Sequence, residues 1–193
     1  MEQRFRRFVR RYLVQAPRGW ILKVTRSNDA MMRAKVTGKT VAIVGNAQSL
    51  LTKSYGPQID GTDLVLRLNK GFVVNENAQG SRTNMVGLTP ELTELETVER
   101  FSPDIFLMLI PKMRHYHFWQ RPTVSKTIFY PFRYWFADRQ KIGRRPSSGF
   151  MAISWLVRLD AAQSITLYGF AFGATSTYYN PAGYKTPHDY PKE

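Results

Sequence analysis

The sequence predicts an α/β fold in which a mostly parallel β-sheet is flanked by helices, preceded by a basic helical arm. Short apolar segments alternate with helical patterns along residues 40–173, and such alternation is typical of parallel strands joined by crossover helices. Positive charge is concentrated at one end: of a net charge of +14, residues 1–40 carry +9, from 11 Lys or Arg and 2 acidic residues. We therefore divide the chain into an arm, residues 1–38, and one domain, residues 39–193.

The arm begins with a basic amphipathic pattern. Arginines surround an apolar stripe with helical spacing, formed by Phe5, Phe8, Val9, Tyr12 and Leu13. Residues 17–19 (Pro-Arg-Gly) are expected to break this helix. A basic helix with an aromatic stripe suits the headgroup layer of an anionic membrane, so we expect peripheral membrane contact through residues 4–24. Docking on the body or on another subunit is the alternative. A basic arm alone is weak evidence for nucleic acid, and no nucleic-acid partner is expected.

The body is expected to contain six strands and three main helices. The apolar segments that predict strands are residues 41–44, 64–68, 84–88, 105–110, 127–130 and 165–168. The segments that predict helices are residues 49–55, 90–100 and 148–159. Acidic residues early and Arg100 late in the second helix suit the helix dipole, and a serine caps the third. Residues 175–193 show no periodicity and are expected to form an active-site loop.

Composition excludes several kinds of site. The chain contains no cysteine, which excludes thiolate zinc sites and cysteine nucleophiles and suits a reducing cytosol. No apolar stretch is long enough to span a membrane, and the N-terminus lacks the apolar region of a signal peptide. His115 and His117 have no third ligand at metal spacing, so no metal is expected. We therefore expect a cytoplasmic protein, held at the inner face of the membrane by its arm.

Polar segments lie where ligands bind to parallel sheets. Gly45 and Asn46 follow the first strand, Arg67 and Asn69 end the second, and residues 146–149 (Pro-Ser-Ser-Gly) open the last helix. Ligands bind beyond the carboxyl ends of parallel strands, and a helix N-terminus attracts anions. The glycine patterns of dinucleotide sites and P-loops are absent. Taken singly, each residue is explained equally well as a turn, an ion-pair partner or a helix cap.

Three longer stretches of the domain resemble the motifs of one enzyme family. VAIVGNAQSLLTKSYGPQIDGTDLVLRLNKG, residues 41–71, continued by GSRTNMV at residues 80–86, resembles the long sialylmotif of glycosyltransferase family 29, the eukaryotic-type sialyltransferases. RPSSGFMAISWLVRLDAAQSITLYGFAFG, residues 145–173, is similar to the short sialylmotif, and HDYPKE, residues 188–193, to the very small one. Their order and spacing agree, and the sequence is identified as a bacterial-type, cysteine-free member of the family.

The resemblance implies a Rossmann-like single domain, a variant of the GT-A architecture, that uses a CMP-sugar donor and a glycan acceptor without a metal or other cofactor. It implies that Asn46 and Asn69 hold the nucleotide. It also implies that Ser147, Ser148 and Gly149 grip the phosphate and ribose, where a helix N-terminus makes physical sense.

The same resemblance assigns the chemistry to His188. This residue matches the general base that takes a proton from the acceptor hydroxyl, which then attacks the anomeric carbon with inversion. Imidazole suits the task because it titrates near neutral pH. Glu193 is expected either to orient that imidazole or to cap a local turn.

The sequence departs from the family at two places. The third motif should begin with a histidine that donates to the departing phosphate, and Thr177 stands there, followed by Tyr178. A hydroxyl donates a hydrogen bond but brings no charge, so Tyr178, Lys185 or Arg144 is expected to assist. The two cysteines that tie the long and short motifs are also missing: Val41 replaces the first, and a residue near Ala162 the second. Packing alone should hold these motifs together.

The expected function is transfer of sialic acid, or a related nonulosonic acid, from a CMP-sugar to a glycan hydroxyl. A CMP-Kdo-type transferase keeps the fold and changes the donor. A non-catalytic CMP-sugar or glycan-binding relative is the alternative that the missing histidine supports. Trp119 and Trp135 lie between the motifs, where they serve either as acceptor contacts or as core residues; His115 and His117 are expected at the surface or on the acceptor side.

Overall fold

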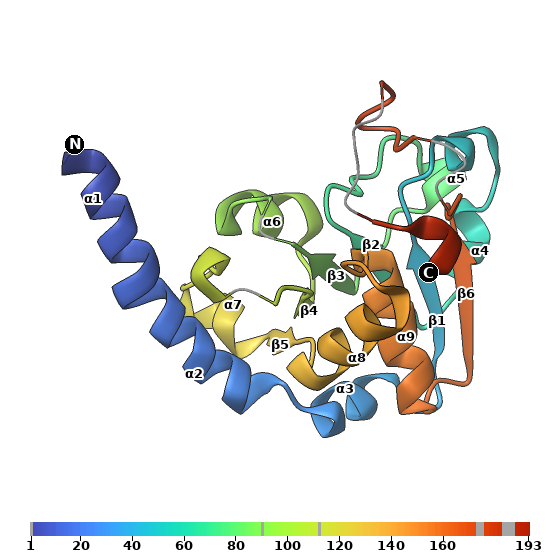
Figure 1. Ribbon diagram of the computed structural model, residues 1–193. Helices are drawn as coiled ribbons and strands as arrows, with labels where there is room; N and C mark the ends of the chain where they lie inside the picture. The colour runs from blue at the N-terminus through green and yellow to red at the C-terminus, as the bar shows by residue number, and fades with distance from the viewer. Residues whose placement is uncertain (1, 90, 112, 173–175, 183–187) are drawn as a thin grey trace.

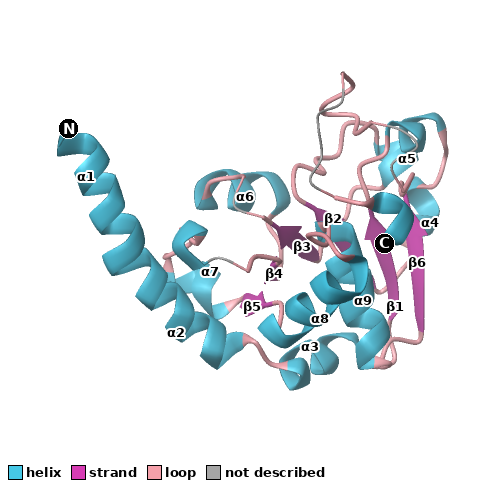
Figure 2. Ribbon diagram, viewed as in Figure 1, coloured by secondary structure: helices cyan, strands magenta, loops and turns pink. Residues whose placement is uncertain are grey.

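The computed structural model describes residues 2–89, 91–111, 113–172, 176–182 and 188–193. Its centre is one six-stranded sheet in the order β5-β4-β3-β2-β1-β6, in which every pairing is parallel (Figures 1 and 2). The strands are Thr40–Val44 (β1), Leu64–Leu68 (β2), Met85–Leu88 (β3), Ile105–Met108 (β4), Thr127–Phe129 (β5) and Ser164–Tyr168 (β6). All six predicted strands are present, and the predicted parallel α/β architecture is confirmed.

The strand order creates a switch point at β1. The chain moves outward from β1 to β5 and then returns to place β6 on the other side of β1, so that Val41 is paired with both Leu64 and Ile165. In open parallel sheets the crevice beyond such a switch point is where ligands bind. The fold therefore directs attention to the carboxyl ends of β1, β2 and β6.

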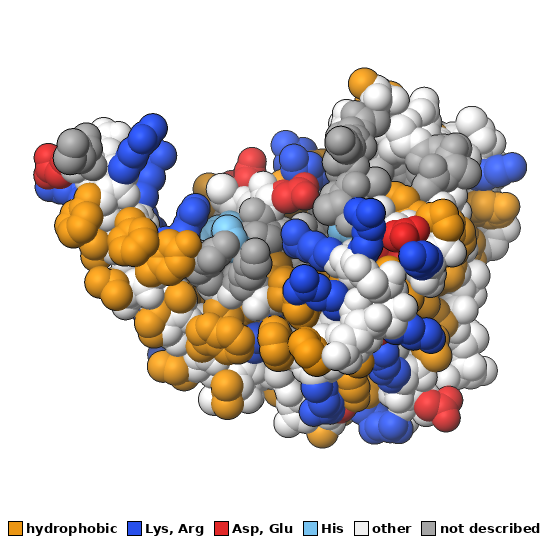
Figure 3. All heavy atoms as spheres, in the orientation of Figure 1, with side chains coloured by type: hydrophobic (Ala, Val, Ile, Leu, Met, Phe, Trp, Pro, Cys, Tyr) orange, Lys and Arg blue, Asp and Glu red, His pale blue; other side chains and the backbone are white. Residues whose placement is uncertain are grey.

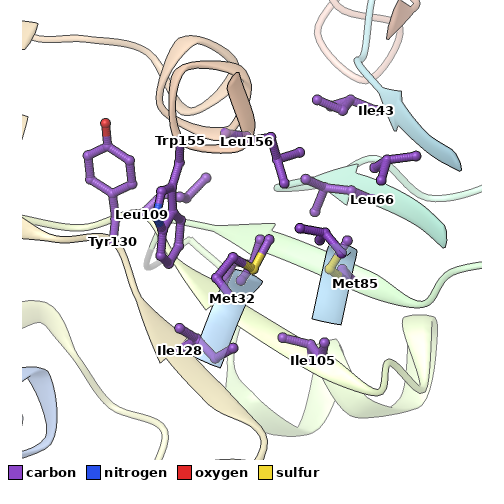
Figure 4. Packing of buried hydrophobic residues seen from close by; sticks show 14 of the residues in the cluster. Met32, Ile43, Leu66, Met85, Ile105, Leu109, Ile128, Tyr130, Trp155 and Leu156 are labelled. Carbon is purple, nitrogen blue, oxygen red and sulfur yellow. The ribbon is translucent and has the colours of Figure 1, made fainter. Parts of the chain in front are cut away.

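Helices cover one face of the sheet, and the largest cluster of buried hydrophobic residues lies between them and the strands. These helices are Asp29–Val36 (α3), Phe132–Ile142 (α8) and Ser148–Leu159 (α9). Trp155 of α9 is fully buried between Tyr130 and the strands, edge-on to the Tyr130 ring (Figure 4). Met32 of α3 fills the same cluster. Burial of these side chains, worth about 1.5–3 kcal/mol each, fixes α9 and therefore its N-terminus against the sheet.

The opposite face carries two smaller clusters. Beside β1 and β2 lie Gln48–Thr52 (η2, a 3₁₀ helix) and Gly56–Asp60 (α4). Beside β3 to β5 lie Glu94–Phe101 (α6) and Met113–His115 (η3, a 3₁₀ helix). The remaining short elements are Glu76–Gln79 (α5), Arg121–Ser125 (α7) and Tyr190–Lys192 (η4, a 3₁₀ helix).

Two predicted helices have shifted starts. The segment predicted over residues 49–55 is helical only as far as Thr52, in the 3₁₀ helix η2, and α4 begins after it at Gly56. The segment predicted over residues 90–100 begins as a helix only at Glu94, because Thr93 and Glu96 form a capping box: each side chain bonds the other's backbone N–H. A capping box satisfies donors that the first helical turn leaves open, and this sets the starting residue.

The arm forms one helical rod along the side of the body, made of Glu2–Val9 (α1), the π-helical Arg10–Gln15 (η1) and Ala16–Arg26 (α2) (Figure 1). The predicted break at residues 17–19 is therefore wrong. Pro17 lies in the first turn of α2, where its missing N–H costs no hydrogen bond. Gly19 is buried against η3, and a Cβ there would lie 3.1 Å from the Met113 backbone oxygen.

The second half of the arm is buried against the body more deeply than the first half. In α2, Gly19 and Lys23 are buried, whereas α1 and η1 bury none of their residues. The boundary at residue 38 stays a prediction, although Met32 and Val36 already pack into the main core. No helix in the described ranges is both long enough and apolar enough to cross a membrane.

Candidate functional site

A cavity of about 500 Å³ opens beyond the carboxyl ends of β1, β2 and β6. We call it the strand-end cavity. It brings together most of the residues singled out from the sequence: its lining includes Gly45, Asn46, Asn69, Ser147, Ser148, Gly149, Thr177, Tyr179, His188 and Glu193. Residues from the first to the last predicted motif, more than 140 positions apart in the chain, thus share one small volume of the size typical for ligand sites.

The floor of this cavity requires glycine at two positions. Where β1 and β6 separate, a Cβ on Gly45 would lie 2.5 Å from the Gly169 backbone oxygen, so no side chain fits. Gly169 itself has φ +68°, a conformation that other residues adopt only with strain. The two glycines let the backbone segments pass closely and leave the space above them open.

Asn46 lines the cavity and has one side-chain atom without a hydrogen-bond partner in the described part of the chain. Its Nδ2 donates to the Leu68 backbone oxygen at 2.9 Å, which fixes the side chain. Its Oδ1 is buried and has no hydrogen-bond partner in the described part of the chain. A buried acceptor without a partner costs free energy, about 1–3 kcal/mol, which a ligand donor would recover.

Both polar atoms of the Asn69 side chain are hydrogen-bonded within the protein, so Asn69 links two segments of the chain. It adopts φ 50°, which asparagine tolerates better than most residues. Its Oδ1 accepts hydrogen bonds from the Thr89 backbone N–H at 2.9 Å and hydroxyl at 3.0 Å. Its Nδ2 donates to Ser148 Oγ at 3.2 Å. Asn69 therefore ties the end of β2 to the start of α9, and it holds Ser148 in position within the cavity lining.

At the N-terminus of α9, Ser147 is hydrogen-bonded to Glu193, and Ser148 and Gly149 line the cavity. Ser147 caps the helix, its Oγ accepting from the Phe150 N–H at 3.1 Å. The Glu193 carboxylate accepts from the Ser147 N–H at 2.7 Å and from the Ser147 hydroxyl. Of the two expected roles for Glu193, capping is the one with direct hydrogen bonds. Ser147 is thus committed to Glu193, while the first-turn N–H groups of Ser148 and Gly149 have no intrahelical acceptor.

His188 is held in a defined protonation pattern. Its Nδ1 lies 2.9 Å from the Arg145 backbone oxygen and 4.0 Å from Glu193 Oε1. A carbonyl oxygen only accepts hydrogen bonds, so Nδ1 carries the proton and donates it. Nε2 is then the basic nitrogen of the neutral ring. This is the tautomer that a general base needs.

Thr177 and Tyr178 point to different places. Thr177 lines the cavity, and its Oγ1 is buried with no hydrogen-bond partner among the described residues. Tyr178 is not part of the lining, and its hydroxyl donates to the Phe72 backbone oxygen at 2.9 Å. Burial raises the pKa of the Tyr178 phenol. The role predicted for Tyr178 stays a prediction, since its hydroxyl is engaged by Phe72 and the neighbouring Tyr179 lines the cavity.

Arg67 lies on the other face of the sheet from α9, and its predicted supporting role stays a prediction. It is fully buried beneath the sheet's α4 side and lies outside the cavity lining. Its guanidinium donates to the backbone oxygens of Gln79, Gly80 and Arg82 at 3.0–3.1 Å. Side chains alternate along a strand, so Arg67 faces away from α9 and pins the loop after α5. Of the other candidates for assistance, Lys185 lies outside the described residues and Arg144 lines the neighbouring space described next.

Two further hollows lie near the strand-end cavity: one shares His188 with it, and the other shares Arg144 with the first. The first, about 440 Å³, is the bridging cavity, lined by Arg144, Phe172, His188, Asp189, Tyr190 and Pro191. The second, about 500 Å³, is the arginine cavity, lined by Thr89, Glu91, Ile110, Pro111, His115, Trp135, Arg139, Gly143, Arg144 and Arg145. Trp135 and His115 thus reach a cavity, whereas Trp119 packs edge-on against Tyr116 in the core. Sequence reasoning missed Arg139, because this residue lies outside all of the recognised motifs.

Backbone pairing replaces the missing cysteines. Val41 of β1 is buried in the main core, with Ala162 packed against the same cluster. Just before β1, Gly38 donates to the Ala161 backbone oxygen at 2.9 Å, and Gln163 donates to the Lys39 oxygen at 2.9 Å. Within the ranges that the structure describes, no three His, Asp or Glu side chains group to hold a metal ion.

Comparison with known proteins gives a consistent result. The family model for glycosyltransferase family 29 (sialyltransferase) matches residues 19–137. The mouse CMP-N-acetylneuraminate-beta-galactosamide-alpha-2,3-sialyltransferase 1 is 29% identical over 174 residues, covering 77% of this chain and 49% of the relative. The human alpha-2,3-sialyltransferase 4 is 24% identical, covering 78% and 55%. The chain therefore spans about half the length of the curated relatives it matches.

Solved structures show the same fold. A crystal structure of a mammalian sialyltransferase aligns with a TM-score of 0.56 at 22% identity, covering 86% of this chain and 73% of that one. The sialyltransferase CstII from Campylobacter jejuni, in complex with the substrate analogue CMP-3FNeuAc, aligns with a TM-score of 0.50 at 16% identity, covering 69% and 65%.

Proposed function

This chain belongs to glycosyltransferase family 29 (sialyltransferase), and from that premise we propose that it transfers sialic acid, or a related nonulosonic acid, from a CMP-sugar to a hydroxyl of a glycan, with inversion and without a metal. The observation that carries the proposal is the strand-end cavity. There Asn46 Oδ1 and Thr177 Oγ1, both buried and without partners in the described part of the chain, lie in the same lining as His188.

The donor would occupy the strand-end cavity. The Asn46 Oδ1 accepts from a nucleotide N–H or hydroxyl, and the N–H groups of Ser148 and Gly149 donate to phosphate oxygens, with the helix dipole favouring negative charge. Asn69 supports this arrangement by holding Ser148. The names of the relatives include CMP-N-acetylneuraminate, which favours a sialic acid over Kdo as the donor sugar.

The reaction uses His188 as a general base. Nε2 takes the proton of the acceptor hydroxyl as its oxygen forms a bond to the anomeric carbon. The bond from that carbon to the phosphate oxygen breaks, and CMP leaves with the electron pair from the opposite face, which inverts the configuration. The Thr177 hydroxyl donates to the departing phosphate in place of the family's histidine. Because Thr177 carries no charge, the α9 N-terminus supplies the remaining stabilisation.

Nucleotide binding gives the first test. CMP at a hundredfold excess over its Kd is expected to raise the Tm by about 5–10 °C, since such binding is worth about 2.7 kcal/mol. UMP, GDP and UDP are expected to shift it less. A donor assay then measures CMP release from CMP-N-acetylneuraminate and CMP-Kdo. Absence of both CMP binding and CMP release would overturn the proposal.

A second candidate is a non-catalytic CMP-sugar or glycan-binding protein. Thr177 at the position of the family's histidine favours it. Clear CMP binding without CMP release from any donor, in the presence of any acceptor, would establish this candidate instead.

We further propose that residues 4–24 contact the anionic inner face of a cytoplasmic membrane. The arm exposes a band of apolar side chains, among them Phe5, Leu13, Ile21 and Val24, each at least 65% exposed. Figure 3 shows this band running along the arm and onto the body, where Trp20 meets the exposed Phe132. Arginines flank the band, and each is worth about 1 kcal/mol near anionic lipid.

Vesicle co-sedimentation tests this attachment. The chain is expected to bind vesicles of phosphatidylcholine with phosphatidylglycerol and to bind pure phosphatidylcholine weakly. Leu13→Ser with Ile21→Ser is expected to weaken binding at least tenfold, because each buried apolar side chain contributes about 1.5–3 kcal/mol. Val157→Ser is the matched control, because Val157 is also exposed but lies on α9. Equal binding by the arm variant and the control would contradict the proposal.

A further inference from the structure

The arginine cavity is strongly unbalanced in charge. Arg139, Arg144 and Arg145 line it and are exposed. In the part of the chain that the structure describes, none of the three forms an ion pair with a carboxylate. The one acidic lining residue is Glu91, which is already 3.9 Å from the ammonium of Lys70. Figure 3 shows Lys and Arg side chains gathered on this face of the molecule.

The same cavity holds a buried donor without an acceptor. Trp135 lines it, and its indole Nε1 is buried with no hydrogen-bond partner among the described residues. The Arg139 guanidinium lies over the Trp135 ring, 5.4 Å from its centre, so a cation and an aromatic ring with an unpartnered N–H line the same cavity. Native proteins rarely leave a buried donor unpaired, since this costs about 1–3 kcal/mol. A guanidinium beside an open N–H matches an oxyanion such as a carboxylate or a phosphate.

The arginine cavity is connected to the reacting residue. Arg144 lines both the arginine cavity and the bridging cavity, and His188 lines both the bridging cavity and the strand-end cavity. The backbone oxygen of Arg145 accepts the Nδ1 proton of His188. The arginine cavity is therefore linked to the proposed base through residues that the neighbouring cavities share.

We propose that the arginine cavity binds an anionic group of the acceptor, so that the preferred acceptor is a glycan bearing a carboxylate or a phosphate near the hydroxyl that receives the sugar. This inference rests on the proposed transferase function. Arg139 and Arg144 contact the oxyanion, and the Trp135 N–H completes its coordination. The strand-end cavity selects the donor, and the arginine cavity selects the acceptor by charge.

The test compares matched acceptors. A neutral β-galactoside, the same galactoside bearing a sialic acid at O6, and the same galactoside phosphorylated at O6 are assayed with one donor. The kcat/KM for at least one anionic acceptor is expected to exceed that for the neutral one at least tenfold, and the two anionic arms distinguish a carboxylate from a phosphate. Arg139→Gln and Arg144→Gln are each expected to reduce that preference towards one. Lys141→Gln, a charge removal in the same helical turn but outside the cavity lining, is expected to keep it.

The possible results distinguish a failure of the acceptor proposal from a failure of the proposed transferase function. CMP release from the donor together with equal use of neutral and anionic acceptors would overturn the acceptor proposal and leave the transferase intact. An unchanged preference in both arginine variants would also overturn it. If the protein neither binds CMP nor releases it, the proposed function fails, and saturation-transfer NMR on the same glycans decides about the cavity. Equal saturation of neutral and anionic glycans there overturns the charge selection, and a preference lost in Arg139→Gln supports it.

Discussion

The strand-end cavity and the arginine cavity meet at the connection between α8 and α9, and they are built in opposite ways. The first takes its polar groups from residues fixed by backbone turns, such as Asn46 and Ser148, which are bonded to other parts of the protein. The second takes them from long, exposed arginines. Fixed dipoles need little reorganisation when a ligand arrives, whereas long side chains lose rotamer entropy. The first cavity is therefore suited to discriminate by position and the second by charge.

The largest expected effect separates chemistry from binding in the first cavity. His188→Ala is expected to lower kcat for transfer by about 10²–10⁴, the usual contribution of a general base. CMP affinity, measured by thermal shift, should remain, because the nucleotide contacts come from other residues. Added imidazole is expected to restore part of the rate to His188→Ala. Full turnover in this variant would contradict the assignment of Nε2 as the base.

The next effect concerns the wall behind the arginine cavity. Lys23 of the arm is 3% exposed, and its Nζ donates to the backbone oxygen of Ile110, a lining residue of that cavity, at 3.0 Å. Burial lowers the pKa of Lys23 from 10.5 to about 8. Between these values the unfolded chain binds more protons than the folded one, so stability should rise as the pH rises from about 8 towards 10.5. At pH 7 Lys23 is charged in both states, and burying this charge destabilises the folded protein by about 3 kcal/mol. The figure follows from the pKa difference, because each pKa unit corresponds to ~1.4 kcal/mol.

Lys23→Met removes this cost and tests the sign. The variant is expected to have a higher Tm than wild type at pH 7, by several degrees, and the difference should shrink as the pH approaches 10. Burial raises the pKa of Tyr116 to about 12, which acts in the opposite direction above pH 10 but equally in both proteins. A pH-independent difference between the two Tm curves would show that Lys23 is not desolvated in the folded state.

The strand-end cavity and the arginine cavity also differ in how far the sequence predicts them. The strands, the α9 helix and the residues that follow strand ends were predictable, because hydrophobic periodicity and local turn chemistry act over a few neighbours. Asn46, Asn69 and Ser148 are of this kind. The placement of Arg67 outside the cavity lining also has a local cause: it lies on β2, just before Asn69, and strand alternation directs it to the other face. The prediction of a helix break at Pro17 was wrong because the π-helical stretch before it allows a new helical turn to begin there.

The arginine cavity was not predictable from any local pattern. Its lining joins Thr89, Ile110 and His115 with Trp135 and Arg139 of α8, which together come from four segments of the chain. Aromatic and basic residues between the motifs were compatible with core packing as well as with acceptor contact, and only tertiary packing separates Trp119 from Trp135. An unpaired guanidinium is likewise a property of the folded chain, since the sequence does not show which carboxylates lie near.

The smallest expected effect is the sharpest test of how the strand-end cavity works. Thr177→Val keeps the side-chain shape and removes a hydroxyl that is buried and without a partner in the described structure. Because the free protein loses no hydrogen bond, the Tm should stay equal or rise. If that hydroxyl donates to the departing phosphate, kcat should nevertheless fall about tenfold, the value of one hydrogen bond of about 1.4 kcal/mol.

Thr97→Val is the matched control, since Thr97 Oγ1 is buried but donates to the Thr93 backbone oxygen at 2.8 Å. The control should lower the Tm and leave kcat unchanged, so the two variants must move the two measurements in opposite ways. A loss of Tm without loss of rate in Thr177→Val would make its hydroxyl a structural group and return the stabilisation of the leaving group to the α9 N-terminus alone.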